Sequence, residues 1–233
     1  MKGEMNKAVR SVLDLVFPRY CVGCGRALTG GEETLCATCL CALPRLRYGR
    51  ADDNALLEYL QRGPSLEHAM SLLAYKRGGL TSRVVFDFKY HNHPETARHM
   101  GRMLAYELLP TGIFEGIDAI VPIPLSRQRR LRRGYNQAEM LARGVRDVTG
   151  LKIETMFVRR AASTDPQTML TAEERQENLR GAFRLRGKAV ADVRHILLLD
   201  DVITTGATIL SCAATIKAGC DVKISVLSLA RTV

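Results

Sequence analysis

Short apolar segments alternate with longer amphipathic ones along most of this chain, and two of the apolar segments clearly predict buried strands. Residues 195–199 are mostly apolar and are bounded by polar residues, a pattern typical of a parallel strand covered on both faces. Residues 117–125 form the second strand and end at Pro122 and Pro124, a residue type that suits strand ends. Further strands are predicted at residues 69–75, at residues 153–159 and after Gly181.

Helical spacing of apolar residues and capping residues predict the helices. Thr81 is a candidate helix cap, Thr171 and Glu174 form a capping box, and Gly150 is a stop signal. The predicted helices occupy residues 1–17, 53–62, 81–90, 95–109, 134–148, 171–180 and 209–218. Residues 161–170 are polar and predict an exposed loop, which is suited to serve as an active-site lid. The two clear strands are each followed by a loop and a helix, so the chain contains two strand–loop–helix units.

The loop after the strand at residues 195–199 has the composition of an anion site. Two carboxylates, Asp200 and Asp201, precede a hydroxyl-rich loop with a single glycine, and a helix follows. Backbone N–H groups of such a loop and the helix dipole favour a phosphate, while carboxylates suit sugar hydroxyls or hydrated Mg²⁺. Together these groups predict a site for a ribose 5-phosphate; the alternative is two solvated aspartates beside an ordinary helix cap. The candidate residues are Asp200, Asp201, Thr204, Thr205, Gly206, Ala207 and Thr208.

The loop after the strand at residues 117–125 is strongly basic, with five arginines in the seven residues 127–133. A helix N-terminus beside this much guanidinium charge suits a pyrophosphate, although a solvated basic face or a nucleic-acid contact would use the same residues. Lys89 and Tyr90 end another predicted helix and can reach a phosphate or a base; the alternative is an exposed lysine at a helix end. The candidate contact residues are Arg127, Arg130, Arg133, Gly134, Tyr135, Asn136, Gln137 and Lys89.

Two Cys-x-x-Cys pairs near the N-terminus predict a metal site. Cys21 and Cys24 are followed by Cys36 and Cys39, and four thiolates can close a tetrahedron around Zn²⁺ with no open position, which indicates a structural role. A redox site is the alternative interpretation of a Cys-x-x-Cys pair. Cys41 is a near-miss ligand, whereas Cys212 and Cys220 are expected to be small buried residues.

Composition limits the class of protein without choosing a function. The chain has 233 residues, 46% of them hydrophobic and 25% charged, which is ordinary for a globular protein. Its net charge of +10 favours anionic partners such as nucleic acid, phosphorylated metabolites or a membrane surface. Residues 1–17 have amphipathic rather than secretory patterning, so a cytoplasmic location without a membrane span is expected.

The string from Asp200 to Thr208, D-D-V-I-T-T-G-A-T, resembles the signature of the type I phosphoribosyltransferases. Together with the paired cysteines, the motif V-P-I-P-L followed by R-R-G-Y-N-Q-A, and the Lys89–Tyr90 pair, it makes the chain similar to the ComF family from about residue 15 onward. In the order typical of that family, the chain also contains Gln167, Leu170, Arg175 and residues 178–183.

This resemblance implies a type I phosphoribosyltransferase-like α/β fold, a parallel sheet flanked by helices, with a small zinc-ribbon-like N-terminal module. The implied division is 1–50 for the N-terminal helix and zinc module and 51–233 for the transferase-like domain, with a hood at 51–110 and a core at 111–233. Asp200, Asp201 and Thr204 to Thr208 would then hold phosphoribosyl pyrophosphate (PRPP) with Mg²⁺, the two aspartates being the candidate catalytic residues. Residues 125–134 would form the pyrophosphate loop.

The resemblance also implies a role in natural competence, with single-stranded DNA and a competence helicase-type protein as partners. One departure from related transferases is Thr204, because the hypoxanthine–guanine branch has an acid/base Asp at this position. Three hypotheses therefore remain: a DNA-uptake accessory that binds PRPP, a metabolic phosphoribosyltransferase that acts on a nucleobase or amine, and a ligand sensor without turnover.

Overall fold

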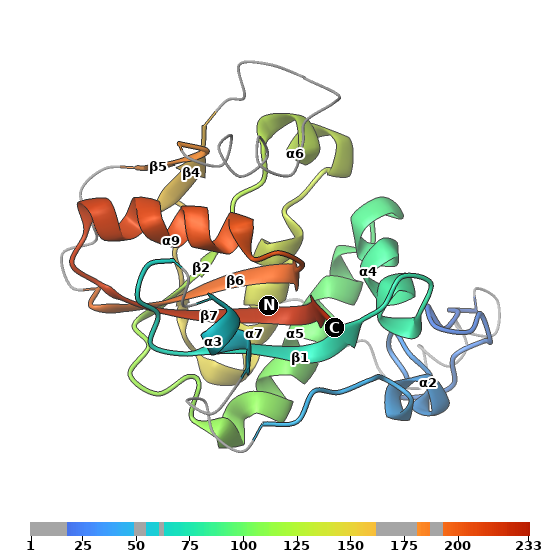
Figure 1. Ribbon diagram of the computed structural model, residues 1–233. Helices are drawn as coiled ribbons and strands as arrows, with labels where there is room; N and C mark the ends of the chain where they lie inside the picture. Colours follow the sequence, from blue (N-terminus) through green and yellow to red (C-terminus); the bar gives the residue numbers. More distant parts are fainter. Residues whose placement is uncertain (1–17, 49–54, 61–62, 162–180, 187–192) are drawn as a thin grey trace.

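The computed structural model describes residues 18–48, 55–60, 63–161, 181–186 and 193–233 (Figure 1). The predicted helices at 1–17 and 171–180 and nearly all of the predicted lid loop lie outside these residues. Gln167, Leu170 and Arg175, which contribute to the family resemblance, also lie outside them.

The centre of the protein is a five-stranded sheet in which every pair of neighbouring strands is parallel, with the strand order β1-β7-β6-β2-β3. Two short antiparallel strands, β4 and β5, form a separate ribbon. The strands are β1 Ala69–Tyr75, β2 Ala119–Pro122, β3 Lys152–Ile153, β4 Val158–Arg160, β5 Phe183–Leu185, β6 His195–Ile203 and β7 Lys223–Thr232. The predicted parallel sheet is confirmed.

Helices cover both faces of this sheet (Figure 1). Helices α3 and α9 pack on one face, and α4, α5 and α7 pack on the other, so each face has its own apolar core. Alternate residues of β6 supply both cores: Ile196 and Leu198 join the first, and Leu197 and Leu199 join the second. The helices are α2 Ala37–Cys41, α3 Ala55–Leu60, α4 Leu80–Tyr90, α5 Pro94–Leu108, α6 Arg127–Arg133, α7 Gln137–Thr149 and α9 Ala207–Gly219, with a 3₁₀ turn at Leu109–Thr111.

The structure corrects two of the strand predictions. β6 does not end at the acidic pair but continues to Ile203, because β7 still pairs beside it, with Asp200 opposite Ser228 and Val202 opposite Ala230. The strand predicted at residues 153–159 is instead two strands: β3 pairs with β2 in the main sheet, and β4 pairs with β5 in the ribbon. Sequence alternation cannot show such a change of partner.

Capping also differs from the prediction at two helices. The arginine-rich segment is the helix α6 rather than a loop, because the Ser126 hydroxyl accepts from the Arg129 N–H at its start and Gly134, with φ 77°, ends it. Gly134 therefore closes α6 and does not open α7, which is capped by Asn136. Thr81 does not cap α4, since Gly79 is the residue before the first turn and Thr81 is buried inside the helix.

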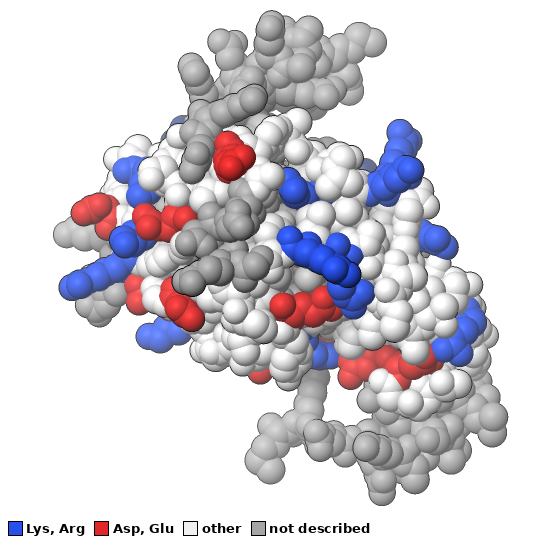
Figure 2. Space-filling model, turned by 60° about the horizontal axis from the view of Figure 1, so that its bottom comes forward, with Lys and Arg blue, Asp and Glu red and all other residues white. Residues whose placement is uncertain are grey.

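Basic and acidic side chains lie side by side on the face that Figure 2 turns forward. Several ion pairs join distant elements, among them Arg98 to Asp147 between α5 and α7, at 2.7 Å. Among the described residues, no helix is both long and apolar enough to cross a membrane.

Helices α5 and α7 touch backbone to backbone at two glycines. A Cβ added at Gly101 would lie 2.2 Å from the carbonyl oxygen of Leu141, and one added at Gly144 would lie 2.0 Å from the carbonyl oxygen of Arg98. Only glycine allows this approach, because the atoms in the way belong to the backbone.

We expect Gly144→Ala to lower the free energy of unfolding by about 2 kcal/mol or more, as measured by urea denaturation. Helix propensity alone would change stability by about 1 kcal/mol in the opposite direction, so the sign of the result is informative. Gly30→Ala is the control, because a Cβ at Gly30 has open space around it. Equal stability of the two variants would contradict the close helix contact.

Candidate functional site

The topology places a crevice at the carboxyl ends of β2 and β6. The chain passes from β2 through α7 to β3 on one side and from β6 through α9 to β7 on the other, and β2 and β6 are neighbours with Pro122 beside Leu199. In open parallel sheets, ligands bind where the connections diverge in this way. The segments that follow β2 and β6 are the two motifs singled out in the sequence, so the structure brings both to one edge of the sheet.

The loop at residues 204–206 joins β6 to α9 and is supported by α3. Gly206 precedes α9 with φ 71°, and no side chain caps this helix N-terminus. A Cβ at Gly206 would lie 2.4 Å from Cδ2 of Leu60, and the Tyr59 hydroxyl donates to the carbonyl of Thr205 at 3.4 Å. The glycine is thus required by both backbone conformation and the close packing of α3. Nothing in residues 53–62 predicted this support.

The hollow beside this loop is lined by Asp200 and by residues 202–209. Thr204 and Thr205 are exposed, and Thr208 is half-buried in the first turn of α9. Uncapped N–H groups, hydroxyl donors and one carboxylate therefore meet in one small space. This combination can hold a phosphate and hydrogen-bond a neighbouring hydroxyl group.

The two adjacent aspartates point to opposite faces of the sheet, as strand alternation requires. Asp200 lies on the α9 face, in the hollow. Asp201 lies on the α4 face, where its Oδ1 pairs with Nζ of Lys89 at 2.8 Å, and both side chains are largely buried. Of the acidic pair, the structure therefore places Asp200 beside the threonine loop and holds Asp201 in an internal ion pair.

Burial raises the pKa of Asp200, and the charge of Asp201 raises it further. The positive charges of Lys89 and Arg160, on the two sides of the sheet, lower this pKa. Arg160, on β4, is partly buried with its guanidinium 5.3 Å from the ring centre of Phe183, and burial and the nearby Arg129 lower its pKa. Sequence reasoning missed Arg160, because no motif marks it and it lies just beyond the strand predicted at residues 153–159.

The predicted pyrophosphate residues fall into two groups. Tyr135, Asn136 and Gln137 are used within the fold: the Tyr135 hydroxyl donates to the carbonyl of Phe88, and Asn136 caps α7 and donates to the carbonyl of Ile123 at 3.0 Å. Burial, with a contribution from the charge of Asp87, raises the pKa of Tyr135 to about 12.

The α6 arginines form the second group. Arg127 and Arg130 are exposed, and Gly134 beside them is exposed as well. Arg133 is half-buried and donates to Oε1 of Gln137 at 3.1 Å. The amide nitrogen of Gln137 is buried without a partner among the described residues. The basic group is thus presented outward at the rim of the crevice.

The four predicted cysteines form one cluster, with their sulfur atoms within 4.8 Å of one another. The Sγ atoms of Cys24 and Cys36 are 3.8 Å apart, which matches the edge of about 3.8 Å expected for a tetrahedron with metal–sulfur bonds of about 2.3 Å. The N–H groups of Cys36 and Cys39 donate to the sulfur atoms of Cys21 and Cys36. The cluster has the composition and geometry of a structural metal site, and the near-miss Cys41 is exposed and outside it.

We call the segment that carries the four cysteines, residues 21–41, the metal module. It packs against the start of α4 and against α5. A Cβ at Gly23 would lie 2.7 Å from Leu80, and Arg83 donates to the carbonyl of Gly23. Glu33 binds both His99 and Arg102 of α5, at 2.5 and 2.6 Å. Hydrogen bonding from Arg26 is the main cause that lowers the pKa of the Cys36 thiol to about 6, which favours the thiolate that binds metal.

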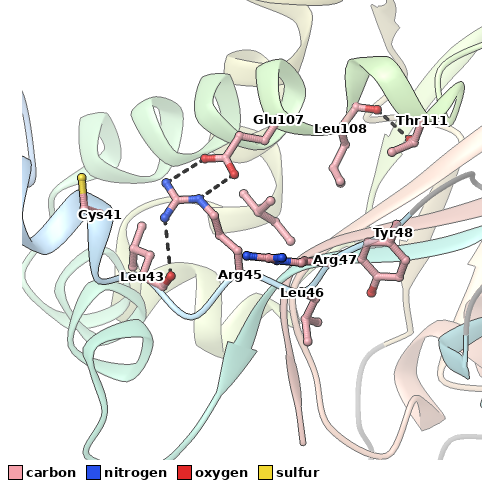
Figure 3. A pocket seen from close by; sticks show the side chains of 10 residues that line it. Cys41, Leu43, Arg45, Leu46, Arg47, Tyr48, Glu107, Leu108 and Thr111 are labelled. Carbon is pink, nitrogen blue, oxygen red and sulfur yellow. Dashed lines mark hydrogen bonds and ion pairs between the residues drawn. The ribbon is translucent and has the colours of Figure 1, made fainter.

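A second cavity, of about 510 Å³, lies between the segment after the metal module and the end of α5 (Figure 3). Arg45 and Glu107 form a bidentate ion pair in the wall of this cavity, with nitrogen–oxygen distances of 2.7 and 2.9 Å. Its lining residues include neither the acidic pair nor the threonine loop, so this cavity is separate from the crevice.

The raised pKa of Asp200 predicts a pH-dependent stability. Because the folded protein holds this proton more tightly than the unfolded chain, ionised Asp200 opposes folding, and the contribution of Asp200 to stability falls as the pH rises above about 4. We expect Asp200→Asn to gain free energy of unfolding relative to wild type as the pH rises from this value through the raised pKa. Urea denaturation across that range would measure it, and a difference that does not change with pH would refute the burial argument.

Metal binding can be tested with two cysteines that are close in sequence. We expect Cys36→Ser to lose the bound metal and melt at a lower temperature, because structural metal binding contributes directly to folding. Cys41→Ser is the matched control and should keep both its metal content and its melting temperature. Elemental analysis of the purified proteins measures the metal, and equal metal loss in both variants would exclude the assigned ligand set.

No protein-family model matches the chain. Among solved structures, it is similar to the glutamine phosphoribosylpyrophosphate amidotransferase of B. subtilis with 14% identity and a TM-score of 0.42, covering 62% of this chain and 30% of that one. It is also similar to an adenine phosphoribosyltransferase with 17% identity and a TM-score of 0.36, covering 60% of this chain and 74% of that one.

Curated relatives extend over nearly the whole sequence. The DNA utilization protein YhgH of Escherichia coli is 30% identical over 219 residues, which cover 91% of this chain and 90% of the relative. Competence protein F of Haemophilus influenzae is 29% identical over 204 residues, which cover 83% of this chain and 88% of the relative. This similarity covers most of each chain, and the chain belongs to the ComF family of these proteins.

Proposed function

We propose that this protein binds PRPP with Mg²⁺ in the crevice between β2 and β6 and acts on single-stranded DNA in its uptake or utilization. The observation that carries the ligand proposal is the loop at residues 204–208, which presents hydroxyls and the uncapped N-terminus of α9 beside Asp200. A phosphate at one end and a carboxylate acceptor at the other suit a ribose 5-phosphate.

In this proposal each motif takes one part of the ligand. The 5-phosphate binds the threonine loop, Asp200 accepts hydrogen bonds from ribose hydroxyls, and the arginines of α6 face the pyrophosphate. Mg²⁺ would bridge the pyrophosphate oxygens and supply charge neutralisation. Asp201 supports the site from the opposite face through Lys89, since its carboxylate is already paired.

The DNA role rests on the family and on charge. The relatives carry the names DNA utilization protein and competence protein F, and a net charge of +10 favours a polyanionic partner. We further propose Zn²⁺ as the metal of the cysteine cluster, because four thiolates at tetrahedral spacing suit it. A cytoplasmic site of action is consistent with seven cysteines, all among the described residues, of which none forms a disulfide.

The alternative is a metabolic phosphoribosyltransferase that moves ribose 5-phosphate to a nucleobase or amine. Thr204 is exposed at the loop position where a related branch has an acid/base aspartate, so no described residue of the loop supplies that proton transfer. The two functions differ in whether PRPP is turned over and with which acceptor.

We expect PRPP with Mg²⁺ to raise the melting temperature of the zinc-loaded protein, by the equivalent of about 2.7 kcal/mol at a hundredfold excess over Kd. Asp200→Asn should lose most of this protection. Asp221→Asn is the control, because Asp221 is an exposed aspartate in the α9–β7 connection, at the opposite edge of the sheet. Absence of protection in wild type would refute PRPP binding.

The same samples decide between the two functions through pyrophosphate release, measured with and without single-stranded DNA and with a set of nucleobases and amines. Release that requires a nucleobase or amine would identify a metabolic transferase and overturn the DNA proposal. Protection by PRPP without acceptor-dependent release would support a binding site that serves a DNA-handling protein.

A further inference from the structure

Two aromatic side chains stand exposed on the outer face of α4. Phe86 is 52% exposed and Tyr90 is 49% exposed, and their ring centres are 4.7 Å apart. They are four residues apart and therefore neighbours on one helix face, whereas the core-facing side of α4 uses Val84, Val85 and Phe88. Neither of these two residues belongs to the core, so the packing of the fold does not explain why both are aromatic.

The aromatic pair adjoins the basic helix α6. The guanidinium of Arg133 lies over the ring of Tyr90, 5.4 Å from its centre. The Tyr135 hydroxyl, just beyond α6, donates to the carbonyl of Phe88 and holds the ends of the two helices together. His91 adds a further ring against Phe86, with centres 5.3 Å apart.

The charge of α6 has no acidic counterpart in the described part of the chain. Its five arginines form no ion pair with a described carboxylate, whereas basic residues elsewhere do, as Arg98 does with Asp147 and Arg45 with Glu107. Four of the five are exposed. Unpaired guanidinium groups on an outward-facing helix suit phosphates, and flat exposed rings suit unstacked bases.

We propose that Phe86 and Tyr90 form a stacking platform for the bases of single-stranded DNA, with the arginines of α6 contacting the phosphates of the same strand. This inference rests on the proposed DNA function and assigns it a surface. A duplex would keep its bases away from rings that stand on a convex helix, so the platform selects single strands. Lys89, between the two rings in sequence, turns inward to Asp201, so the strand would lie at the rim of the crevice.

The test compares two ligands that differ only in their bases. Fluorescence anisotropy would measure binding of an oligothymidylate and of an abasic deoxyribose-phosphate oligomer of the same length. We expect wild type to prefer the oligothymidylate, and Phe86→Ala with Tyr90→Ala to weaken its binding about tenfold or more while leaving abasic binding unchanged. Tyr106→Ala is the matched control, because Tyr106 is a 66% exposed aromatic residue on α5.

The arginines are tested through the salt dependence of the same binding, between about 50 and about 300 mM salt. Arg130→Gln and Arg132→Gln should each reduce the slope of log K against log salt by about 0.7, since each removes one phosphate contact. The platform variants should keep the wild-type slope. Melting temperatures confirm that every variant is folded.

The outcomes separate this inference from the function on which it rests. Wild-type protein that binds neither oligomer would overturn the DNA function and the platform together, and would leave the aromatic face to a protein contact. Wild-type protein that binds both oligomers equally, or platform variants that bind as wild type does, would overturn the platform alone. PRPP protection of the wild-type protein, measured without DNA, tests the PRPP proposal separately from these results.

Discussion

The position of β6 between β2 and β7 is the constraint on which the rest of the site depends. β2 pairs with this strand as far as Leu199, and β7 keeps it extended through the acidic pair to Ile203. Because side chains alternate along an extended strand, Asp200 and Asp201 face opposite sides of the sheet. Each then meets a different cation: Lys89 lies beside Asp201, and Arg160 lies on the side of Asp200.

This division gives the two faces of the sheet different roles. The face of α9 and α3 carries the hollow, and Leu60 of α3 packs against Gly206 in the loop that lines it. The face of α4 and α5 carries the metal module, which packs on Leu80 and bonds to Arg83 at the start of α4. The far end of α4 carries Lys89, so the cysteine cluster helps to position the helix that neutralises Asp201.

Among the described residues, charged side chains are paired beside α5 but not on α6. On the α5 side, ion pairs such as those of Glu33 with His99 and Arg102 join the metal module to the core. At the rim of the crevice, the arginines of α6 lack such partners among the described residues. Surface ion pairs contribute little stability individually, but their distribution decides where positive charge stays available for an anionic ligand.

Much of this protein could be predicted from the sequence because the signals are local. The residues of β1, the helix after the threonine loop and the four cysteines were all predicted, since apolar runs, capping residues and Cys-x-x-Cys spacing depend on neighbours in the chain. The arginine-rich segment was recognised for its charge but not as a helix, because Gly134 was assigned to the start of the next helix and the cap at Ser126 was not recognised.

Only the tertiary structure decided which distant groups meet. The ion pair of Lys89 with Asp201 joins residues 112 positions apart, and Tyr59 reaches Thr205 across 146 positions. The place of Arg160 near Asp200 depends on β4, which pairs with β5 in a ribbon separate from the main sheet. A sequence specifies which residues can carry charge, bind metal or stack, whereas strand order, register and helix packing determine which of them share a site, because those contacts arise from long-range packing that no local pattern records.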